Sequence, residues 1–338
     1  MTVMLGAPKQ DLPRPRGELS EAVVELLRGA PGRGPVPEPG PADPYGEDLH
    51  LALHTCYELH YHGFTAVDAD WEWDPGLLGL RAALEQRFLR ALREDVPGGA
   101  DLDAELDGLL VTPADPEGPS RFLRDEGEWW QMREYFVHRS IYHHKEADPY
   151  AWAIPRLRGQ AKASLVAVEF DEFGGGRGER VHAQLYADLL AGAGLNPEYL
   201  HYLDVVPAPM LALVNMMSLF GLHRSLRGAL VGHFATVEIT SPPGSQRLVA
   251  ALERLEADPA CVLFFREHVE ADAVHEQIMR TGVIGDLLRR EPELTESVVF
   301  GIQVTNLLED RFADHVLGAW RAGRSSLRET GRAPGVAD

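Results

Sequence analysis

Cysteine is scarce in this sequence, and its two copies stand far apart. Cys56 and Cys261 are too few for a disulfide framework, and their separation does not match the short spacings of zinc sites. We therefore expect two buried free thiols, the usual state of a cysteine without a partner.

Long apolar runs are also missing. No stretch approaches the roughly 20 apolar residues that a transmembrane helix needs. Prolines interrupt the N-terminal segment before the apolar core of a signal peptide could form. We therefore expect a cytoplasmic chain that does not insert into a membrane.

Positive charge is in short supply. The sequence has 32 Lys and Arg against 52 Asp and Glu, which gives a formal net charge of −20. Binding to nucleic-acid phosphates requires a basic face, and so does binding to an anionic lipid surface. The charge balance therefore excludes nucleic acid and anionic membranes as expected partners.

The alternation of apolar and polar residues that marks a strand is not found, whereas helical spacing runs through most of the chain. We predict an all-α bundle, with residues 1–45 as a Pro/Gly-rich flexible arm that holds one short helix at 18–27. Residues 46–322 form the helical domain, in which 46–125 is an N-terminal extension packed on the rest, and 323–338 form a frayed tail. The spacing predicts further helices at 49–59, 77–92, 126–145, 156–173, 179–193, 209–220, 222–239, 245–255, 260–279 and 295–322.

Ionisable side chains lie on the apolar face of the predicted helix 260–279. Phe265, His268, Asp272, His275 and Met279 share this face, because steps of three and four residues follow one side of a helix. Burying such polar groups without partners is costly. A shared metal ion is the simplest partner for all three, and hydrogen-bonded core histidines are the alternative.

Three other predicted helices, at 156–173, 179–193 and 222–239, each carry an ionisable residue on an apolar face. A set of imidazoles and carboxylates favours iron or manganese over the metals that select thiolates. Facing helices of a bundle are a common frame for such a site. The remaining histidines, including His143 and His144, are interpreted as core residues or as supports for the ligands. The residues alone thus predict a metal site made of Glu172, His182, Glu238, His268, Asp272 and His275.

At this point the sequence resembles the haem-oxygenase-like di-iron oxidases and oxygenases, a family of iron-containing redox enzymes. The resemblance covers roughly 46–322 and is carried by KEADPYAWAIPRL (145–157), DEFGGG (171–176) and HVEADAVHE (268–276). It implies a haem-oxygenase-like helical bundle with additional N-terminal helices, holding two iron ions. The ligand order of the family, Glu, His, Glu and then His-x-x-x-Asp-x-x-His, matches Glu172, His182, Glu238, His268, Asp272 and His275.

An N-oxygenating subset of this family has one further carboxylate on an earlier helix, and Glu146 matches it. The resemblance then implies a non-haem di-iron oxygenase that uses O2 on an amine or amino-acid nitrogen in a biosynthetic pathway. It also implies a small-molecule substrate and an external electron donor, while a homodimer is left open. No residue beyond the metal ligands is assigned a catalytic role, and no organic cofactor is expected.

The expected division of ligands has Glu172, His182 and His268 on one iron. Asp272, His275 and Glu146 are expected on the other, with Glu238 bridging the two. Two alternatives stay open. The same site could perform oxidative C–C cleavage or desaturation of an acid or amino acid, or the chain could be a non-catalytic helical protein that binds iron.

Overall fold

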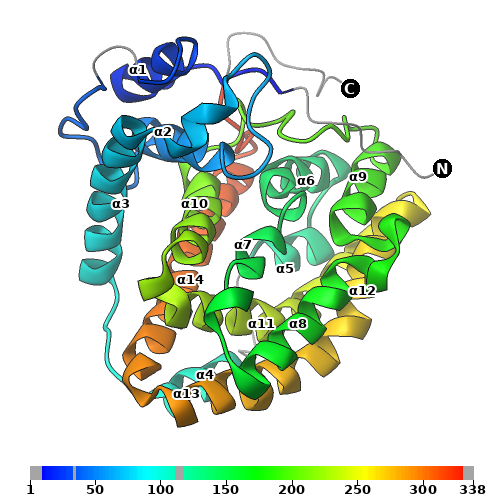
Figure 1. Ribbon diagram of the computed structural model, residues 1–338. Coiled ribbons are helices and arrows are strands. Elements are labelled where there is room, and N and C mark those ends of the chain that lie inside the picture. The colour runs from blue at the N-terminus through cyan, green and yellow to red at the C-terminus, as the bar shows by residue number, and fades with distance from the viewer. Residues whose placement is uncertain (1–9, 33–35, 111–117, 330–338) are drawn as a thin grey trace.

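The computed structural model describes residues 10–32, 36–110 and 118–329, apart from the side chains of residues 270–274. Every regular element within these ranges is a helix, and none is a strand (Figure 1). The predicted all-α class is therefore confirmed. None of the described helices combines the length and the apolarity that crossing a bilayer requires.

Helices follow one another along the described part of the chain, and their connections range from single turns to segments as long as 193–207. The first half of the chain contains α1 (Glu18–Leu27), α2 (Glu47–Glu58), α3 (Pro75–Asp95), α4 (Leu102–Leu110), α5 (Pro119–Asp125), α6 (Trp129–His143) and α7 (Asp148–Ala151). The second half contains α8 (Gly159–Glu172), α9 (His182–Gly192), α10 (Ala208–Leu222), α11 (Arg227–Arg254), α12 (Pro259–Gln277), α13 (Gly285–Arg290) and α14 (Thr295–Arg321). The segment η6 (Ile278–Ile284) is a π-helix, and the 3₁₀ turns are η1 (Ala69–Trp73), η2 (Ile154–Arg156), η3 (Gly174–Gly176), η4 (Gly178–Arg180), η5 (Arg224–Leu226) and η7 (Pro292–Leu294).

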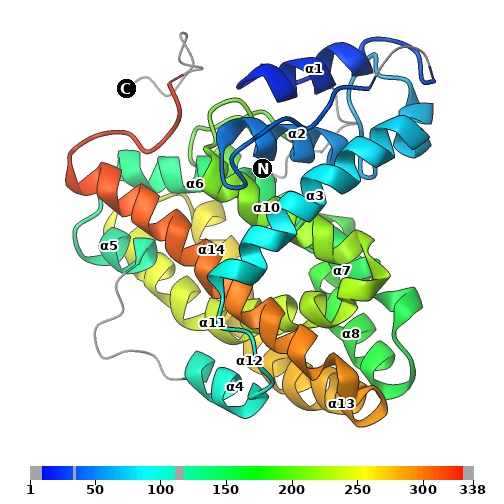
Figure 2. The same cartoon turned by 90° about the vertical axis from the view of Figure 1, so that its left-hand side faces the viewer.

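The core forms around α10 and α11. Nearly every residue of α10 is buried, as expected for a helix that is apolar on all sides. This helix packs on α2 and α14, while α11 packs along both α12 and α14. On the other side of α12 lies α9, and α8 packs against η6 (Figures 1 and 2). The helices that follow α7 therefore meet in one layered bundle.

Helices α1 and α2 cover one end of this bundle (Figure 2). Helix α1 has the predicted bounds, and it buries Leu19, Val23 and Leu27 in the core while packing on α2. The predicted arm 1–45 and the predicted tail 323–338 lie partly outside the described residues. Both cysteines are buried and free, as predicted.

The prediction of two separate helices at 222–239 and 245–255 is wrong. A single helix, α11, runs from Arg227 to Arg254 and contains Pro242 and Pro243. Proline removes a backbone donor and disfavours a helix interior. The long contacts of α11 with α12 and α14 hold the chain helical across this point, because tertiary packing overrides local propensity.

The helical segment that begins with α12 also continues further than predicted. It runs directly into the π-helix η6 and then into α13, whereas the sequence pattern predicts an end at residue 279. Gly282 allows η6 to lie close to α8, because a Cβ at this position would fall 2.4 Å from the Ser164 hydroxyl oxygen. Short π segments are frequent at functional sites, and this one begins three residues after His275.

Candidate metal centre

Glu146 lies on a turn between two helices. Helix α6 ends at His143, residues 144–147 form a turn, and α7 starts at Asp148 with Pro149 in its first turn. Proline is tolerated there, because the first N–H groups of a helix have no intrahelical acceptor. The break in the helix directs Glu146 into the protein, where it is 8% exposed.

A buried ion pair fixes this turn. The Nζ atom of Lys145 lies 2.7 Å from Oε2 of Glu58 on α2, and both side chains are almost fully buried. The hydroxyl of Tyr199 donates to the same oxygen at 3.0 Å. The Lys145 ammonium also lies 4.1 Å from the centre of the Tyr61 ring, an additional attraction for a cation. The N-terminal helix α2 therefore helps to position the residue that precedes Glu146.

A glycine turn brings Glu172 and His182 together. Glu172 is the last residue of α8, and His182 is the first of α9. Gly174 has φ of +72°, and a Cβ there would lie 2.6 Å from the backbone nitrogen of Val181. Only glycine fits this left-handed position without strain. The chain thus folds back and places His182 Nδ1 2.7 Å from Oε2 of Glu172.

Helices α11 and α12 supply the other side of the centre. His268 and His275 lie two turns apart on α12, and both are buried. The Nδ1 atom of His275 lies 2.9 Å from Oε2 of Glu238 on α11, and it lies 4.0 Å from Oε1 of Glu172. The opposite ring nitrogen, Nε2, lies 3.1 Å from the carboxylate of Asp171.

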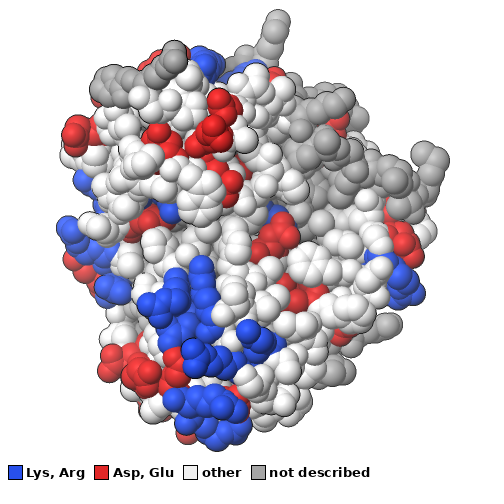
Figure 3. Space-filling view, in the orientation of Figure 1, with Lys and Arg blue, Asp and Glu red and all other residues white. Residues whose placement is uncertain are grey.

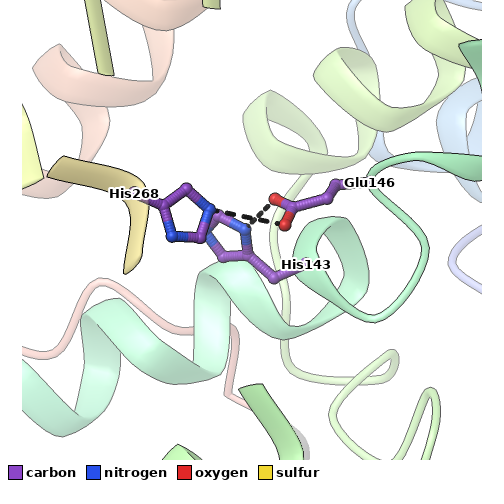
Figure 4. A group of neighbouring side chains, drawn as sticks. All are labelled: His143, Glu146 and His268. Atoms are coloured by element: carbon purple, nitrogen blue, oxygen red, sulfur yellow. Dashed lines mark hydrogen bonds and ion pairs between the residues drawn. The ribbon is translucent and has the colours of Figure 1, made fainter. Parts of the chain in front are cut away.

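These side chains form three overlapping groups of potential metal ligands. Within each group, one donor atom of each residue lies within 4.8 Å of the others. Figure 4 shows the first group, in which the two imidazoles face the Glu146 carboxylate from α6 and α12. Glu146 joins the first group to the second, and Glu172 joins the second to the third. The groups are His143, Glu146 and His268; Glu146, Glu172 and His182; and Glu172, Glu238 and His275.

The structure brings together six of the seven residues predicted as ligands, namely Glu146, Glu172, His182, Glu238, His268 and His275. The side chain of Asp272, the seventh, lies outside the described part of the chain. The arrangement differs from the expected division in two respects. Glu146 lies beside His182 and His268 rather than beside His275. Glu146 and Glu172, not Glu238, are the carboxylates that two groups share.

Two residues beside the centre were not predicted as ligands. His143 contacts Glu146 through Nδ1, and Asp171 contacts His275. His143 stands three residues before Glu146, a spacing that offered a weak signal. Asp171 carried no signal, because its side chain is 56% exposed and lies off the apolar face of α8.

Glu146 is held as a carboxylate. Burial alone would raise its pKa. The charge and hydrogen bond of His143, together with the hydrogen bonds of His182 and His268, outweigh this effect. These contacts hold the pKa of Glu146 well below its ordinary value. A buried carboxylate that stays ionised needs nearby positive charge.

The pKa values of two imidazoles, His182 and His275, are shifted upward. Burial alone would lower the pKa of His182, but the carboxylates of Glu172 and Glu146 raise it well above its ordinary value. Burial likewise opposes protonation of His275, yet contacts led by the hydrogen bond with Glu238 raise its pKa to about 9. In the protein without metal these imidazoles therefore carry protons that a metal ion would replace.

The donor atoms fit a metal ion. Oε1 of Glu146 and Nδ1 of His182 are both buried and lie 3.3 Å apart, so a single metal ion could bind both. His268 donates its Nδ1–H to the carbonyl oxygen of Phe264 at 2.8 Å, which leaves Nε2 directed at Glu146. A backbone carbonyl that fixes one ring nitrogen is a usual support for a metal-ligating histidine. Mixed carboxylate and imidazole donors suit iron or manganese.

A family model described as iron-containing redox enzyme matches residues 133–310, which is more than half of the chain. The match begins within α6 and ends within α14, so it includes every described group of potential ligands. It leaves out α2 and therefore Glu58. Curated proteins give no match to the chain.

Proposed function

Because the chain belongs to the family of iron-containing redox enzymes, we propose that it is a non-haem di-iron oxygenase that transfers an oxygen atom from O2 to an amine nitrogen. The observation that carries this proposal is the position of Glu172. Its two carboxylate oxygens face His182 on one side and His275 on the other. A carboxylate in this position can bridge two metal ions.

The geometry favours one division of the ligands. Glu146, His182 and His268 would hold the first iron, and Glu238 and His275 would hold the second, with Glu172 shared. Asp272 is proposed as a further ligand from its spacing on α12 alone. His143 contacts the Glu146 oxygen that does not face His182 and His268, so it would orient this carboxylate.

The bound irons would supply the redox chemistry that activates O2. The protein side chains keep the imidazoles oriented. Asp171 accepts the Nε2–H of His275, and Phe264 accepts the Nδ1–H of His268. In the proposed reaction one oxygen atom enters the N–H bond of an amine and forms a hydroxylamine. The other leaves as water after taking up two protons and two electrons from an external donor.

The buried carboxyl group of Glu169 supports the proposal that the substrate is cationic. It lies one helical turn before Glu172 on α8 and is 2% exposed. Among the described residues, neither of its carboxylate oxygens has a hydrogen-bond partner. Burial, followed by the negative charges of Glu172, Asp148 and Glu238, raises the pKa of Glu169 to about 9. At neutral pH the carboxyl of Glu169 is therefore protonated, and a positively charged amine or amino acid would stabilise its ionised form and supply the unmet hydrogen bonds.

The proposal is tested by loading the protein with Fe(II) without oxygen, then adding 18O2 with a panel of amines and amino acids. We expect O2 consumption that depends on one cationic amine and a product that gains one labelled oxygen on nitrogen. A shortened or desaturated carbon skeleton would instead support C–C cleavage or desaturation. Iron binding without any O2 consumption would refute the oxygenase and leave an iron-binding protein.

A further inference from the structure

A polar pocket lies at the opposite end of α8 from Glu172. It has a volume of about 500 Å³, within the range of sites for small organic ligands. Figure 3 shows lysine and arginine side chains gathered on the lower half of this face, over the region where Figure 1 places α8 and α13. The charged residues that line the pocket are Arg156, Arg158, Arg224, Arg227, Arg290 and Glu291.

The positive charge of this pocket is only partly compensated. Arg227 forms an ion pair with Glu291, and Arg290 forms one with Asp286 at 2.9 Å. Within the described residues, Arg158 and Arg224 have no ion-pair partner, and both are exposed. A concentration of uncompensated arginines is unexpected on a chain whose net charge is −20.

Arg156 adds a third such charge. Its guanidinium donates to the backbone carbonyl oxygens of Gly221 and Leu222, at the end of α10, and no carboxylate of the described residues pairs with it. Burial lowers the pKa of Arg156, and the nearby charge of Arg224 lowers it further. The mutual repulsion of these side chains would be relieved by an anion between them.

Part of the pocket is held in place before any ligand binds. Asp286 accepts from Arg290 and from the backbone N–H of Ala161 in the first turn of α8. The Arg290 guanidinium lies over Gly159, where a Cβ would come within 2.7 Å of its Nη2 atom. Gly159 also has φ of +56°, a conformation that favours glycine. This part of the lining is therefore a packed structure rather than a set of loose surface side chains.

We propose that this pocket binds a small molecule that carries at least two phosphate-type negative charges and an organic portion. The planar guanidinium group matches the oxygens of a phosphate through two parallel hydrogen bonds. The pocket is larger than a bare anion requires, and Pro155 and Leu287 add apolar surface to its lining. This surface would contact the organic portion of the ligand.

The ligand of this pocket is distinct from the molecule oxidised at the metal centre. Helix α8 separates Arg158 from Glu172 by 14 residues, which corresponds to about 20 Å along the helix axis. A molecule that fills the arginine pocket therefore does not reach the carboxylates and imidazoles of the centre. The pocket is a separate binding site, and the inference does not depend on the proposed oxygenase activity.

The test measures binding of inorganic pyrophosphate and of ADP to the full chain by calorimetry at moderate salt concentration. We expect saturable binding of one molecule per chain. The double variant Arg158→Ala/Arg224→Ala should lose at least tenfold in affinity. The control, Arg90→Ala/Arg324→Ala, removes the same charge from two exposed arginines outside the pocket lining and should bind as the unchanged protein does.

Because Arg158 directly precedes α8, the single variant Arg224→Glu provides a second test that leaves this helix start intact. We expect it to lose binding while keeping an unchanged circular dichroism spectrum. Equal binding by the pocket and control variants would overturn the proposal. So would an absence of saturable binding, or binding of an acidic polypeptide but of neither phosphate probe.

Discussion

The buried pair of Lys145 and Glu58 gives a quantitative prediction about how the N-terminal helices support the metal centre. Replacing Lys145 by Met removes the ammonium but keeps a side chain of similar length. Glu58 would then be a buried carboxylate without its cation, because both side chains are at most 1% exposed. Removing one partner of a fully buried ion pair typically destabilises a protein by about 3–5 kcal/mol.

Two comparison variants separate charge from packing. In the double variant Lys145→Met/Glu58→Gln no unpaired charge remains, so we expect most of the lost stability to return. The Tyr199 hydroxyl can still donate to the amide oxygen of Gln. Lys162→Met is the matched control, because Lys162 is half-buried on α8 and has no ion pair among the described residues. We expect its effect to stay within about 0.5 kcal/mol.

The assay is urea unfolding of the metal-free protein, followed by iron binding under native conditions. Lys145→Met should also weaken iron binding, because Lys145 directly precedes Glu146. A loss below about 1 kcal/mol in Lys145→Met would place this pair among weak, solvent-screened contacts and refute the reasoning. A double variant as unstable as the single one would refute the charge argument and assign the effect to packing.

Three further predictions concern the centre itself. Gly174→Ala should cost about 1–3 kcal/mol in urea unfolding, because a Cβ collides with backbone at a left-handed position; Gly178→Ala, where a Cβ meets nothing within 4 Å, should not. Glu169→Gln should raise the KM for a cationic amine at least tenfold, with iron content unchanged; an unchanged KM would exclude Glu169 from substrate binding. In the metal-free protein the pKa of His275 is raised from 6.5 to about 9, so the folded chain holds an extra proton. The stability from this proton is present below pH 6.5 and is lost as the pH rises to about 9. The pKa of Glu169 is also raised to about 9, so its proton affects stability in the same direction. The melting temperature should fall over this range while iron affinity rises, and a flat melting profile would contradict both pKa values.

The sequence was most informative where local spacing alone determines geometry. The stripe that contains His268 and His275 could be recognised because residues four and seven apart share a helix face. The same reasoning identified Glu172, His182 and Glu238, because each shares an otherwise apolar helix face that is expected to be buried. The three glycines after Glu172 marked the turn that folds α9 back toward α8.

Contacts between distant segments could not be predicted in the same way. Glu58 and Lys145 are separated by 87 residues, and no periodicity links a side chain on α2 to a turn after α6. Asp171 meets His275 only after α8 and α12 have packed. Glu172 belongs to two groups of potential ligands and Glu238 to only one. This difference depends on how the helices pack against one another, which a sequence pattern does not encode.

The continuous α11 shows the opposite limitation. Pro242 and Pro243 lie between the two predicted helices, and they are strong local signals for a helix end. Packing against two neighbouring helices outweighed this local preference. Helix existence was therefore predicted more successfully than helix bounds.

The central claim is that Glu172 is shared by two metal ions, and counting Fe(II) per chain in three variants tests it most directly. We expect two irons in the unchanged protein, one in Glu146→Ala, one in Glu238→Ala and fewer than one in Glu172→Ala. All variants should be checked for an unchanged helical circular dichroism spectrum. A folded Glu172→Ala variant that still binds two irons, or an unchanged protein that binds only one, would contradict the account.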